Sequence, residues 1–396
     1  MSRNLCLLCK GSKGLCGKNP CPLLASHHMK MKLKHNVSKD FFGPSTSVFV
    51  GSYNYPNVFV GPMASMQTEL TKIADNPGSW FGQDYSRLIE MRSAMLRSKF
   101  SQDVKSIGRY AQENQLLAMA KKPTDVELNF NKKPVFDLRF SSMIQPMGPS
   151  AALQKMMVTE NIKIDKWVDY IVSDDLKAAE AAGRLYENKQ DVYKITNILS
   201  SGALGKKKKI VPTRWSITAT DDIIFKEVVG KVKDHRTVNQ YIVYSSNYLD
   251  NHFEILLMPG SWEFENFEAW SPDTPWSQGA KETQILEEYE SFKGRKKYAK
   301  EQAGGYYAAR LGIIEGLNDI KRQARVISFR EISPGYNIPM GVWVVRETVR
   351  NAFKNSPIKF DTLKEALNHI DSKLKIPVSE YRKKSRMLQQ RTIFDF

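Results

Sequence analysis

Residues 241–272, YIVYSSNYLDNHFEILLMPGSWEFENFEAWSP, decide the fold class of this chain. Their segments 241–249 and 253–272 are rich in β-branched and aromatic residues, a composition that predicts β-strands. The preceding segment VPTRWSITATDD, residues 211–222, is strand-like for the same reason. The middle of the chain is therefore predicted to form strands that are rich in aromatic side chains.

Strand and helix patterns also precede this region. In SVFVGSYNYPNVFVGPM, two short strands at 48–50 and 58–60 are predicted to flank a turn at residues 53–57. Apolar residues then repeat at helical spacing after Asp84, a suitable N-cap, and again across residues 165–186. The first half of the chain is therefore expected to combine strands with amphipathic helices.

The composition of the chain changes after the aromatic strands. Residues 271–279, SPDTPWSQG, have the Pro, Ser and Gly content of a domain boundary. The elements expected beyond it are a helical run over 281–325 bent near Gly304 and Gly305, strands over 325–332 and 342–349, and a last helix opened by the capping box Thr362-x-x-Glu365.

All four cysteines lie within the first 21 residues, in the pattern C-x2-C-x6-C-x4-C. They are Cys6, Cys9, Cys16 and Cys21. Two residues between the first two thiols let both sulfurs turn toward one tetrahedral ion. An iron–sulfur cluster also uses four thiolates, and disulfides would need a secreted context, for which the chain shows no secretory signal. We expect a structural zinc site, with the iron–sulfur cluster and with free or disulfide-bonded thiols as alternatives.

Positive charge is concentrated near these cysteines. The net charge is +17, and residues 1–39 carry eight cations and no acid, which accounts for almost half of it. Such a segment attracts polyanions, above all nucleic acid, by counterion release, although solubilising lysines are an alternative. A second run of four lysines at 206–209 follows serines and glycines, and is expected on a mobile loop that is either solvated or in contact with phosphate.

An aromatic residue follows the second lysine run. Trp215 beside Arg214 is suited to stack on an exposed base, although a tryptophan in the core is the alternative. The candidate nucleic-acid-binding residues are Lys10, Lys13, Lys18, Lys206, Lys207, Lys208, Lys209, Arg214 and Trp215.

Carboxylates of the strand-rich region are candidates for catalysis, although no standard catalytic motif appears. Asp221 and Asp222 end the strand-like segment 211–222, where side chains can converge on Mg or Mn as two-metal phosphodiester chemistry requires. Glu263 and Glu265, two residues apart on a strand, share one face. The alternative is that all four are caps, turn formers or ion-pair partners of arginines.

The C-terminal segment EYRKKSRMLQQRTIFDF, residues 380–396, is basic and then apolar. Its end, Gln390-x-x-Ile393-x-x-Phe396, resembles the PCNA sliding-clamp interaction motif of replication and repair proteins. Glutamine suits a small polar pocket, and the apolar residues on one helical turn suit a groove. The usual motif has two consecutive aromatics, and Phe394 is the candidate to compensate. So charged a tail is not expected to pack on the protein's own core.

These patterns favour an α/β or α+β fold: a mixed two-domain body with an N-terminal four-cysteine metal knuckle and a flexible C-terminal tail. The expected divisions are a basic metal-binding module at 1–35, a large α/β domain at 36–272, a smaller domain at 280–377 and a mobile tail at 379–396. No run of about 18 apolar residues predicts a membrane span.

Several long motifs in this order resemble the archaeal Nre family of DNA-repair factors, over nearly the whole chain. Besides the cysteines and the tail, they are FVGSYNYPNVFVGP, VPTRWSITATDD, LLMPGSWEFENFEAW and GGYYAARLGIIEGL. The resemblance implies an archaeal cytoplasmic protein that repairs damaged DNA together with the clamp. It implies no catalytic residue.

Three functions are therefore compatible with the sequence. The first is a repair factor that binds damaged or branched DNA and is tethered to the PCNA clamp. The second is a metal-dependent nuclease, or another DNA-processing enzyme, that uses the region of Asp221 and Glu263. The third is an RNA-binding or RNA-modifying protein, which a zinc knuckle and a basic face would serve equally well. The clamp-like tail favours the first over the third.

Overall fold

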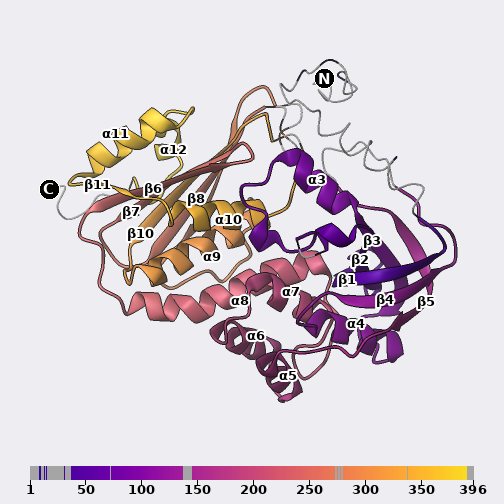
Figure 1. Cartoon of the computed structure of the whole chain (residues 1–396). Coiled ribbons are helices and arrows are strands. Elements are labelled where there is room, and N and C mark those ends of the chain that lie inside the picture. The colour runs from indigo at the N-terminus through magenta and orange to yellow at the C-terminus, as the bar shows by residue number, and fades with distance from the viewer. Residues whose placement is uncertain are drawn as a thin grey trace. The chain divides into compact units, whose positions relative to one another are not determined.

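The computed structural model describes residues 37–71, 73–136, 145–272, 280–336 and 338–389, with the single residues 9, 13, 15, 31, 274 and 277. The chain divides into two compact units (Figure 1). Asn19–Ile224 form the first, which we call the barrel unit. Phe225–Phe396, grouped with Met1–Lys18, form the second, which we call the sheet unit. The mixture of strands and helices confirms the predicted mixed class.

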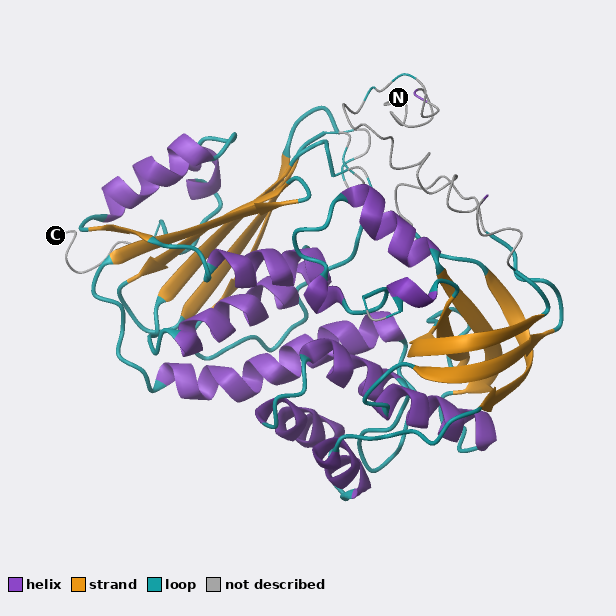
Figure 2. Cartoon of the chain, viewed as in Figure 1, coloured by secondary structure: helices purple, strands orange, loops and turns teal. Residues whose placement is uncertain are grey.

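Five strands of the barrel unit close into a barrel in the order β1-β2-β3-β5-β4 (Figure 2). β3 and β5 are parallel, and the other neighbouring pairs are antiparallel. A helix between the third and fourth strands completes the connectivity of an OB-fold. The elements of this unit are β1 (Asp40–Val50), β2 (Asn57–Ser65), η1 (Thr68–Leu70), η2 (Pro77–Ser79), α3 (Tyr85–Ser93), β3 (Met95–Asp103), α4 (Arg109–Met119), β4 (Thr124–Phe130), β5 (Ser150–Val158), α5 (Lys166–Ser173), α6 (Ala178–Glu187) and α7 (Val192–Ser200).

The barrel closes around apolar residues that its strands point inward, in regular alternation along β4. Val48 and Val50 of β1 face Val58 and Val60 of β2 in one buried cluster, which confirms the two strands predicted there. Burial of each such side chain stabilises the fold by about 1.5–3 kcal/mol. Ile210, which directly follows the four lysines, joins the same cluster. The lysine run is therefore anchored to the barrel at one end.

The sheet unit contains a six-stranded sheet in the order β11-β6-β7-β10-β8-β9. β10 and β8 are parallel, and the remaining neighbours are antiparallel. The elements are β6 (Tyr241–Tyr248), β7 (Asn251–Met258), β8 (Glu263–Trp270), β9 (Gln284–Glu290), α9 (Gly304–Asp319), β10 (Arg325–Ile332), α10 (Trp343–Ala352), β11 (Ile358–Phe360), α11 (Leu363–Lys373) and α12 (Val378–Arg382), while α8 (Thr213–Lys233) runs across the division between the units.

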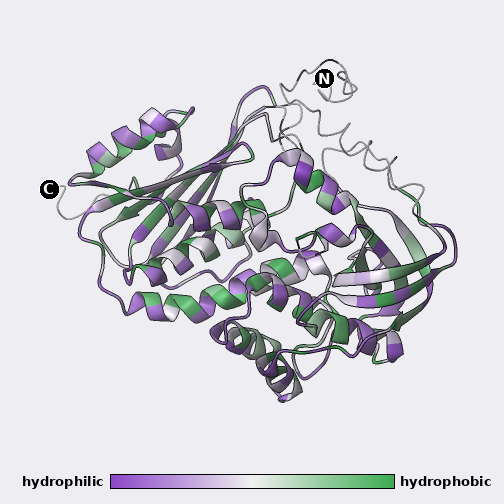
Figure 3. Cartoon of the chain, viewed as in Figure 1, coloured by the Kyte–Doolittle hydropathy of each residue, from purple (hydrophilic) through white to green (hydrophobic). Residues whose placement is uncertain are grey.

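Helices cover both faces of this sheet. Phe264 of β8 contacts Tyr306 of α9 on one face, and Phe267 contacts Tyr381 of α12 on the other. α11 packs on the second face with Ala366 and its neighbours, and Figure 3 shows hydrophilic and hydrophobic residues alternating along it. Both capping-box hydrogen bonds predicted at the start of α11 are present, although α12 follows as a further helix.

Three predicted elements have a different structure. Residues 211–222 enter helix α8, because Ser216, Thr220 and Ile224 recur every four residues on its buried side. The predicted helical run 281–325 contains strand β9 before α9 begins at Gly304. Residues 342–349 lie mostly in helix α10, where valines are tolerated because the helix is buried almost all round. β-Branched composition alone was therefore a poor guide to these segments.

The two compact units divide at Ile224 and not at the composition change near residue 275. Residues 271–279 connect β8 to β9 within one sheet, so the composition change there does not separate two compact units. The predicted mobile tail begins too early, because residues 379–389 pack on the sheet. Tyr381, Met387 and Leu388 are buried in its core cluster. These apolar residues lie on either side of the basic ones, so that the segment has an inner face despite its charge. Among the described residues, no helix has the length and hydropathy required to cross a membrane.

Candidate nucleic-acid interface

Backbone hydrogen bonds join three segments of the barrel unit that are distant in sequence. Val104 N, just after β3, donates to Pro56 O in the β1–β2 turn (3.0 Å), and Ile210 N donates to Val104 O (2.8 Å). Val50 N, at the end of β1, donates to the side chain of Thr213 at the start of α8 (2.9 Å). The β1–β2 turn, the lysine run and the first turn of α8 are therefore held side by side.

Exposed aromatic and cationic side chains meet at this junction. The rings of Tyr55 and Trp215 lie 5.2 Å apart between centroids, and Lys209 Nζ lies 5.3 Å from the centre of the Tyr55 ring. Tyr53, in the same turn as Tyr55, and Arg214, beside Trp215, are both exposed. We call these five residues with Lys207 the aromatic surface. Trp215 is therefore exposed, as its predicted role in stacking on a base requires. The alternative, a tryptophan in the core, is wrong.

The four lysines of the run have different roles. Lys206 forms an exposed ion pair with Asp175 (2.6 Å), and this hydrogen bond raises the pKa of the lysine. Lys208 donates to the carbonyl oxygens of Val172 (2.7 Å) and Ala203 (2.8 Å), and burial lowers its pKa. Lys207 is exposed, and Lys209 lies over Tyr55.

The loop that carries these lysines is tightly turned and hydrogen-bonded, and its mobility stays a prediction. Gly202 and Gly205 adopt φ values of +80° and +82°, which favour glycine, and Lys208 is also left-handed at 42°. Lys206 N donates to Leu176 O, and Lys208 N donates to Gly205 O. Serine and glycine therefore indicate a tightly turned backbone in this loop.

Sequence reasoning identified Arg214 and Trp215 but missed Tyr53 and Tyr55. A signal was present, because the turn at 53–57 was predicted and large aromatic side chains in a turn between two strands are poorly placed to enter a core. The contact between Tyr55 and Trp215 joins residues 160 positions apart, which no local pattern reveals.

Several predicted site residues lie outside the described part of the chain. They are Cys6, Cys16, Cys21, Lys10 and Lys18 near the N-terminus, and Gln390, Ile393, Phe394 and Phe396 in the tail. Cys9 is described and buried, and the backbone N–H of Lys13 donates to its carbonyl oxygen (3.4 Å). The metal and clamp predictions therefore stay predictions.

The candidate catalytic carboxylates belong to different compact units. Asp221 and Asp222 lie in the part of α8 that belongs to the barrel unit, and Asp221 is fully buried. The idea that they end a strand is wrong. In the described residues, no group of three or more His, Cys, Asp and Glu side chains is arranged to hold a metal ion.

Glu263 and Glu265 share one face of β8, as predicted, and both have partners there. Glu263 pairs with Arg325 of the neighbouring strand (3.2 Å). Glu265 accepts hydrogen bonds from Ser385 Oγ (2.5 Å) and from the backbone N–H of Arg386 (2.6 Å). Glu265 therefore holds the segment after α12 against the sheet.

A second carboxyl lies beside Glu265 on the adjacent strand. Burial and the negative charge of Glu265 raise the pKa of Glu287 to about 7, while Arg386, 3.8 Å away, acts in the opposite direction. Burial also raises the pKa of Glu265. This carboxyl pair is a pH-sensitive part of the contact between the sheet and residues 385–388.

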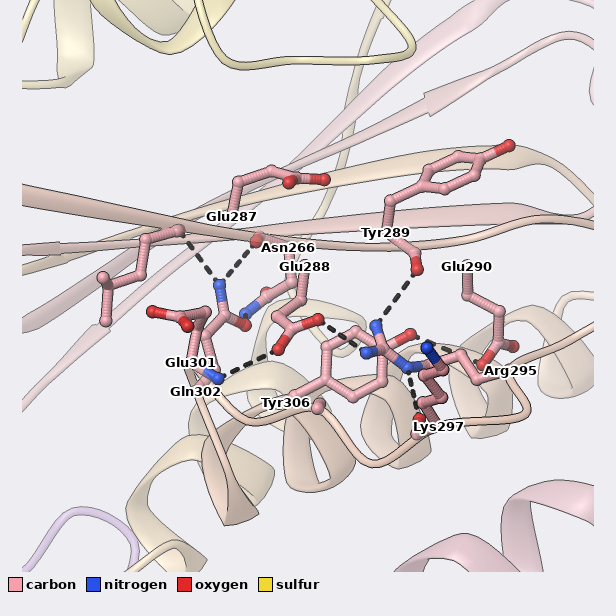
Figure 4. A network of polar contacts seen from close by, with 12 residues as sticks. Asn266, Glu287, Glu288, Tyr289, Glu290, Arg295, Lys297, Glu301, Gln302 and Tyr306 are labelled. Carbon is pink, nitrogen blue, oxygen red and sulfur yellow. Dashed lines mark hydrogen bonds and ion pairs between the residues drawn. The ribbon is translucent and has the colours of Figure 1, made fainter.

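The opposite face of β9 carries a network of polar contacts that fixes the connection to α9. Figure 4 shows Glu288 and Glu290 on this side of the strand, with Glu287 and Tyr289 pointing the other way. Arg295 donates to Glu288 (2.6 Å) and to the backbone of Tyr289 (3.0 Å). The amides of Gln302 and Asn266 also bond to each other (2.6 Å). The network supports packing of the sheet.

Comparisons with known proteins match nearly the whole chain. A family model described as Archaeal Nre, N-terminal, matches residues 15–277, and one described as Archaeal Nre, C-terminal, matches residues 290–396. No solved structure matches the chain.

Three similar proteins are all named as DNA repair proteins. DNA repair protein NreB of Archaeoglobus fulgidus is 37% identical over 396 residues, covering 99% of both chains. DNA repair protein NreA of the same organism is 36% identical, covering 91% of this chain and 92% of its own. DNA repair protein NreA of Haloferax volcanii is 34% identical, covering 89% of this chain and 88% of its own.

Proposed function

This chain belongs to the archaeal Nre family, and from that membership we propose that it acts in DNA repair. The observation that carries the proposal is the similarity over 99% of the chain to a protein named for DNA repair. In finer terms, we propose that the protein binds damaged or branched DNA and is tethered to the PCNA clamp by its C-terminal tail.

The aromatic surface supports the DNA-binding part of this proposal. Its cations attract phosphates, and its exposed rings offer faces for bases, the two kinds of contact that nucleic-acid-binding proteins combine. The carboxylates offer less support for a nuclease, since Glu263 and Glu265 already bind groups of the protein itself.

A binding and cleavage panel tests the proposal. Purified full-length protein is incubated with flap, nicked, single-stranded and crosslinked DNA, with and without Mg²⁺ or Mn²⁺. We expect binding that weakens linearly on a plot of log K against log salt, without cleavage. Absence of binding to every DNA contradicts the proposal, and cleavage that depends on the divalent ion favours the nuclease.

The clamp contact has its own test. Calorimetry compares the full chain with a chain that ends at Gln389, each titrated with the PCNA clamp. We expect the heat of binding to disappear with residues 390–396, because Gln390, Ile393 and Phe396 carry the resemblance to the clamp motif. Unchanged affinity of the shortened chain contradicts the tether.

We also propose that the four cysteines hold one structural zinc ion. Four thiolates satisfy its tetrahedral preference, and so short and glycine-rich a segment lacks the apolar residues to fold alone. Elemental analysis of anaerobically purified protein should give about one zinc per chain. Iron with visible absorbance identifies the cluster alternative.

A further inference from the structure

We propose that the barrel unit binds single-stranded DNA by stacking its bases on the aromatic surface. Tyr53, Tyr55 and Trp215 supply the rings, while the cations at 207, 209 and 214 contact phosphates. The inference rests on the proposed function and deepens it, because it names the form of DNA and the residues that read it.

The exposure of the three rings is the first observation. Tyr53 is 83% exposed, Trp215 46% and Tyr55 42%, so considerable apolar ring area faces water at one place. Each base of a duplex is stacked between its neighbours, so its faces are inaccessible to such rings. Unpaired bases have free faces, and stacking on an aromatic ring is their common mode of recognition.

The position of the surface on the barrel is the second observation. Tyr53 and Tyr55 lie in the connection between β1 and β2 of a barrel with OB-fold connectivity. That connection is one of the loops with which OB-folds contact oligonucleotides. The connectivity and the aromatic residues thus point independently to the same ligand.

The contacts that hold the surface together are the third observation. The turn, the lysine loop and the first turn of α8 are joined by the hydrogen bonds at Pro56, Val104, Ile210 and Thr213. Tyr55 is further fixed by contact with both Trp215 and Lys209. A platform that is ordered before binding loses little conformational entropy when a strand docks.

The charge of the surface also favours a single strand. Lys206 and Lys208 already bond to groups of the protein, so three cations remain: Lys207, Lys209 and Arg214. Three phosphate contacts give a slope of only about −2 on a log–log salt plot for a single strand. So few charges are a weak basis for holding a duplex by its backbone, and stacking must supply the remaining affinity.

Fluorescence anisotropy of the full-length protein tests the inference. The probes are a labelled single-stranded DNA of about 20 nucleotides, longer than the roughly 4–16 that one OB-fold covers, the corresponding duplex, and RNA of the same sequence. We expect the single-stranded DNA to bind most tightly. Tyr53→Ala and Trp215→Ala should each weaken its binding roughly 5- to 150-fold, the range measured for loss of one stacked base.

Matched variants separate stacking from other effects. Tyr53→Phe keeps the ring and should retain binding, while Tyr298→Ala removes an exposed ring of the sheet unit and should leave binding unchanged. Unchanged melting temperatures show that the variants are folded.

The outcomes distinguish the inference from the proposed function. If the protein binds duplex DNA as tightly as single strands, or if Tyr53→Ala and Trp215→Ala bind normally, the stacking inference is wrong and a DNA-binding repair factor still stands. Tighter binding to RNA also overturns the inference. If no DNA binds at all, both proposals fail.

Discussion

The strands β8 and β9 with helix α9 of the sheet unit, and the aromatic surface of the barrel unit, place the same kinds of side chain in opposite environments. Trp262 and Trp270 of the sheet unit are buried, and each donates its indole N–H to a glutamate. Trp215 of the barrel unit is exposed beside Tyr55. Basic residues show the same contrast: Arg310 pairs with Glu290 inside the sheet unit, whereas Arg214 faces solvent.

This difference shows where a ligand is to be sought. In the sheet unit, the arginines and glutamates of the β9–α9 region satisfy one another, so their removal should affect folding first. On the barrel unit, Tyr53, Tyr55 and Trp215 keep large exposed ring areas beside the exposed cations Lys207 and Arg214. We therefore propose a functional role for the rings and cations of the barrel unit, and a structural role for the ion pairs of the sheet unit.

The largest expected effect comes from shortening the chain within the sheet unit. Ending it at Lys384 removes the buried side chains of Met387 and Leu388 and three of the donors to Glu265. We expect a loss of on the order of 3–6 kcal/mol in the free energy of unfolding, from about 1.5–3 kcal/mol for each apolar side chain. Urea denaturation measures it.

Ending the chain at Gln389 is the matched control. It keeps every contact described for residues 385–388, and should leave the unfolding curve unchanged while abolishing clamp binding. Equal stability of the two shortened chains would show that the basic segment contributes nothing to the sheet unit.

A buried ion pair gives the next largest effect. Arg310→Met removes the guanidinium that pairs with Glu290 and lies over the ring of Phe225 (3.8 Å), and leaves a carboxylate buried without its countercharge. We expect unfolding to become easier by about 3–5 kcal/mol. The exposed Arg184→Met, which breaks a pair with Glu180 on α6, should change little. DNA binding by the folded Arg310 variant should be normal, and its loss would contradict the division of roles.

The carboxyl pair of the sheet unit predicts a dependence of stability on pH. The pKa of Glu287 rises from 4.5 to about 7 on folding, so the folded protein holds a proton that the unfolded chain releases between these values. Stability from this group therefore falls as the pH rises through that window. Glu287→Gln should remove the fall and be more stable than the parent at pH 8, by on the order of 1–3 kcal/mol.

Denaturation curves at pH 5 and pH 8 measure this difference. Glu160→Gln, which replaces an exposed carboxyl of the barrel unit, serves as the control and should follow the parent at both values. If Glu287→Gln loses stability on going from pH 5 to pH 8 as steeply as the parent does, the buried pair does not control this contact.

Sequence patterns predicted the elements that depend on residues close together in the chain. Asp84 caps α3 by accepting from Arg87 N, and Thr362 and Glu365 form the capping box, because side chains within three residues determine both. The strands at 48–50 and 58–60 followed from alternation. The closed barrel could not be predicted from such alternation, because its closure depends on pairs such as Asp40 with Asn129, which are 89 positions apart.

Residues of the candidate site were likewise predicted only where their neighbours in sequence gave a signal. Trp215 was identified because its neighbour Arg214 is adjacent in sequence, and Tyr55 was missed because its partner is not. The composition change at 271–279 coincides with the end of the first family model at residue 277, yet the compact units divide at Ile224. The first family model thus ends between β8 and β9, which are hydrogen-bonded neighbours in one sheet.

The smallest expected effects separate two adjacent lysines of the barrel unit. Lys208→Met leaves the carbonyl oxygens of Val172 and Ala203 without their ammonium donor, and should cost about 1–2 kcal/mol of stability. Lys207→Met removes an exposed cation, and should leave stability unchanged while reducing the salt slope of single-stranded DNA binding by about 0.7.

Denaturation curves and salt titrations of both variants measure the two quantities. Because the residues are neighbours of identical type, a difference between them cannot come from net charge or composition. It must come from where each ammonium lies, one on backbone carbonyls within the loop and the other in solvent. If instead Lys208→Met changes the salt slope and Lys207→Met changes stability, the roles assigned to the loop are reversed and Lys207 does not belong to the aromatic surface.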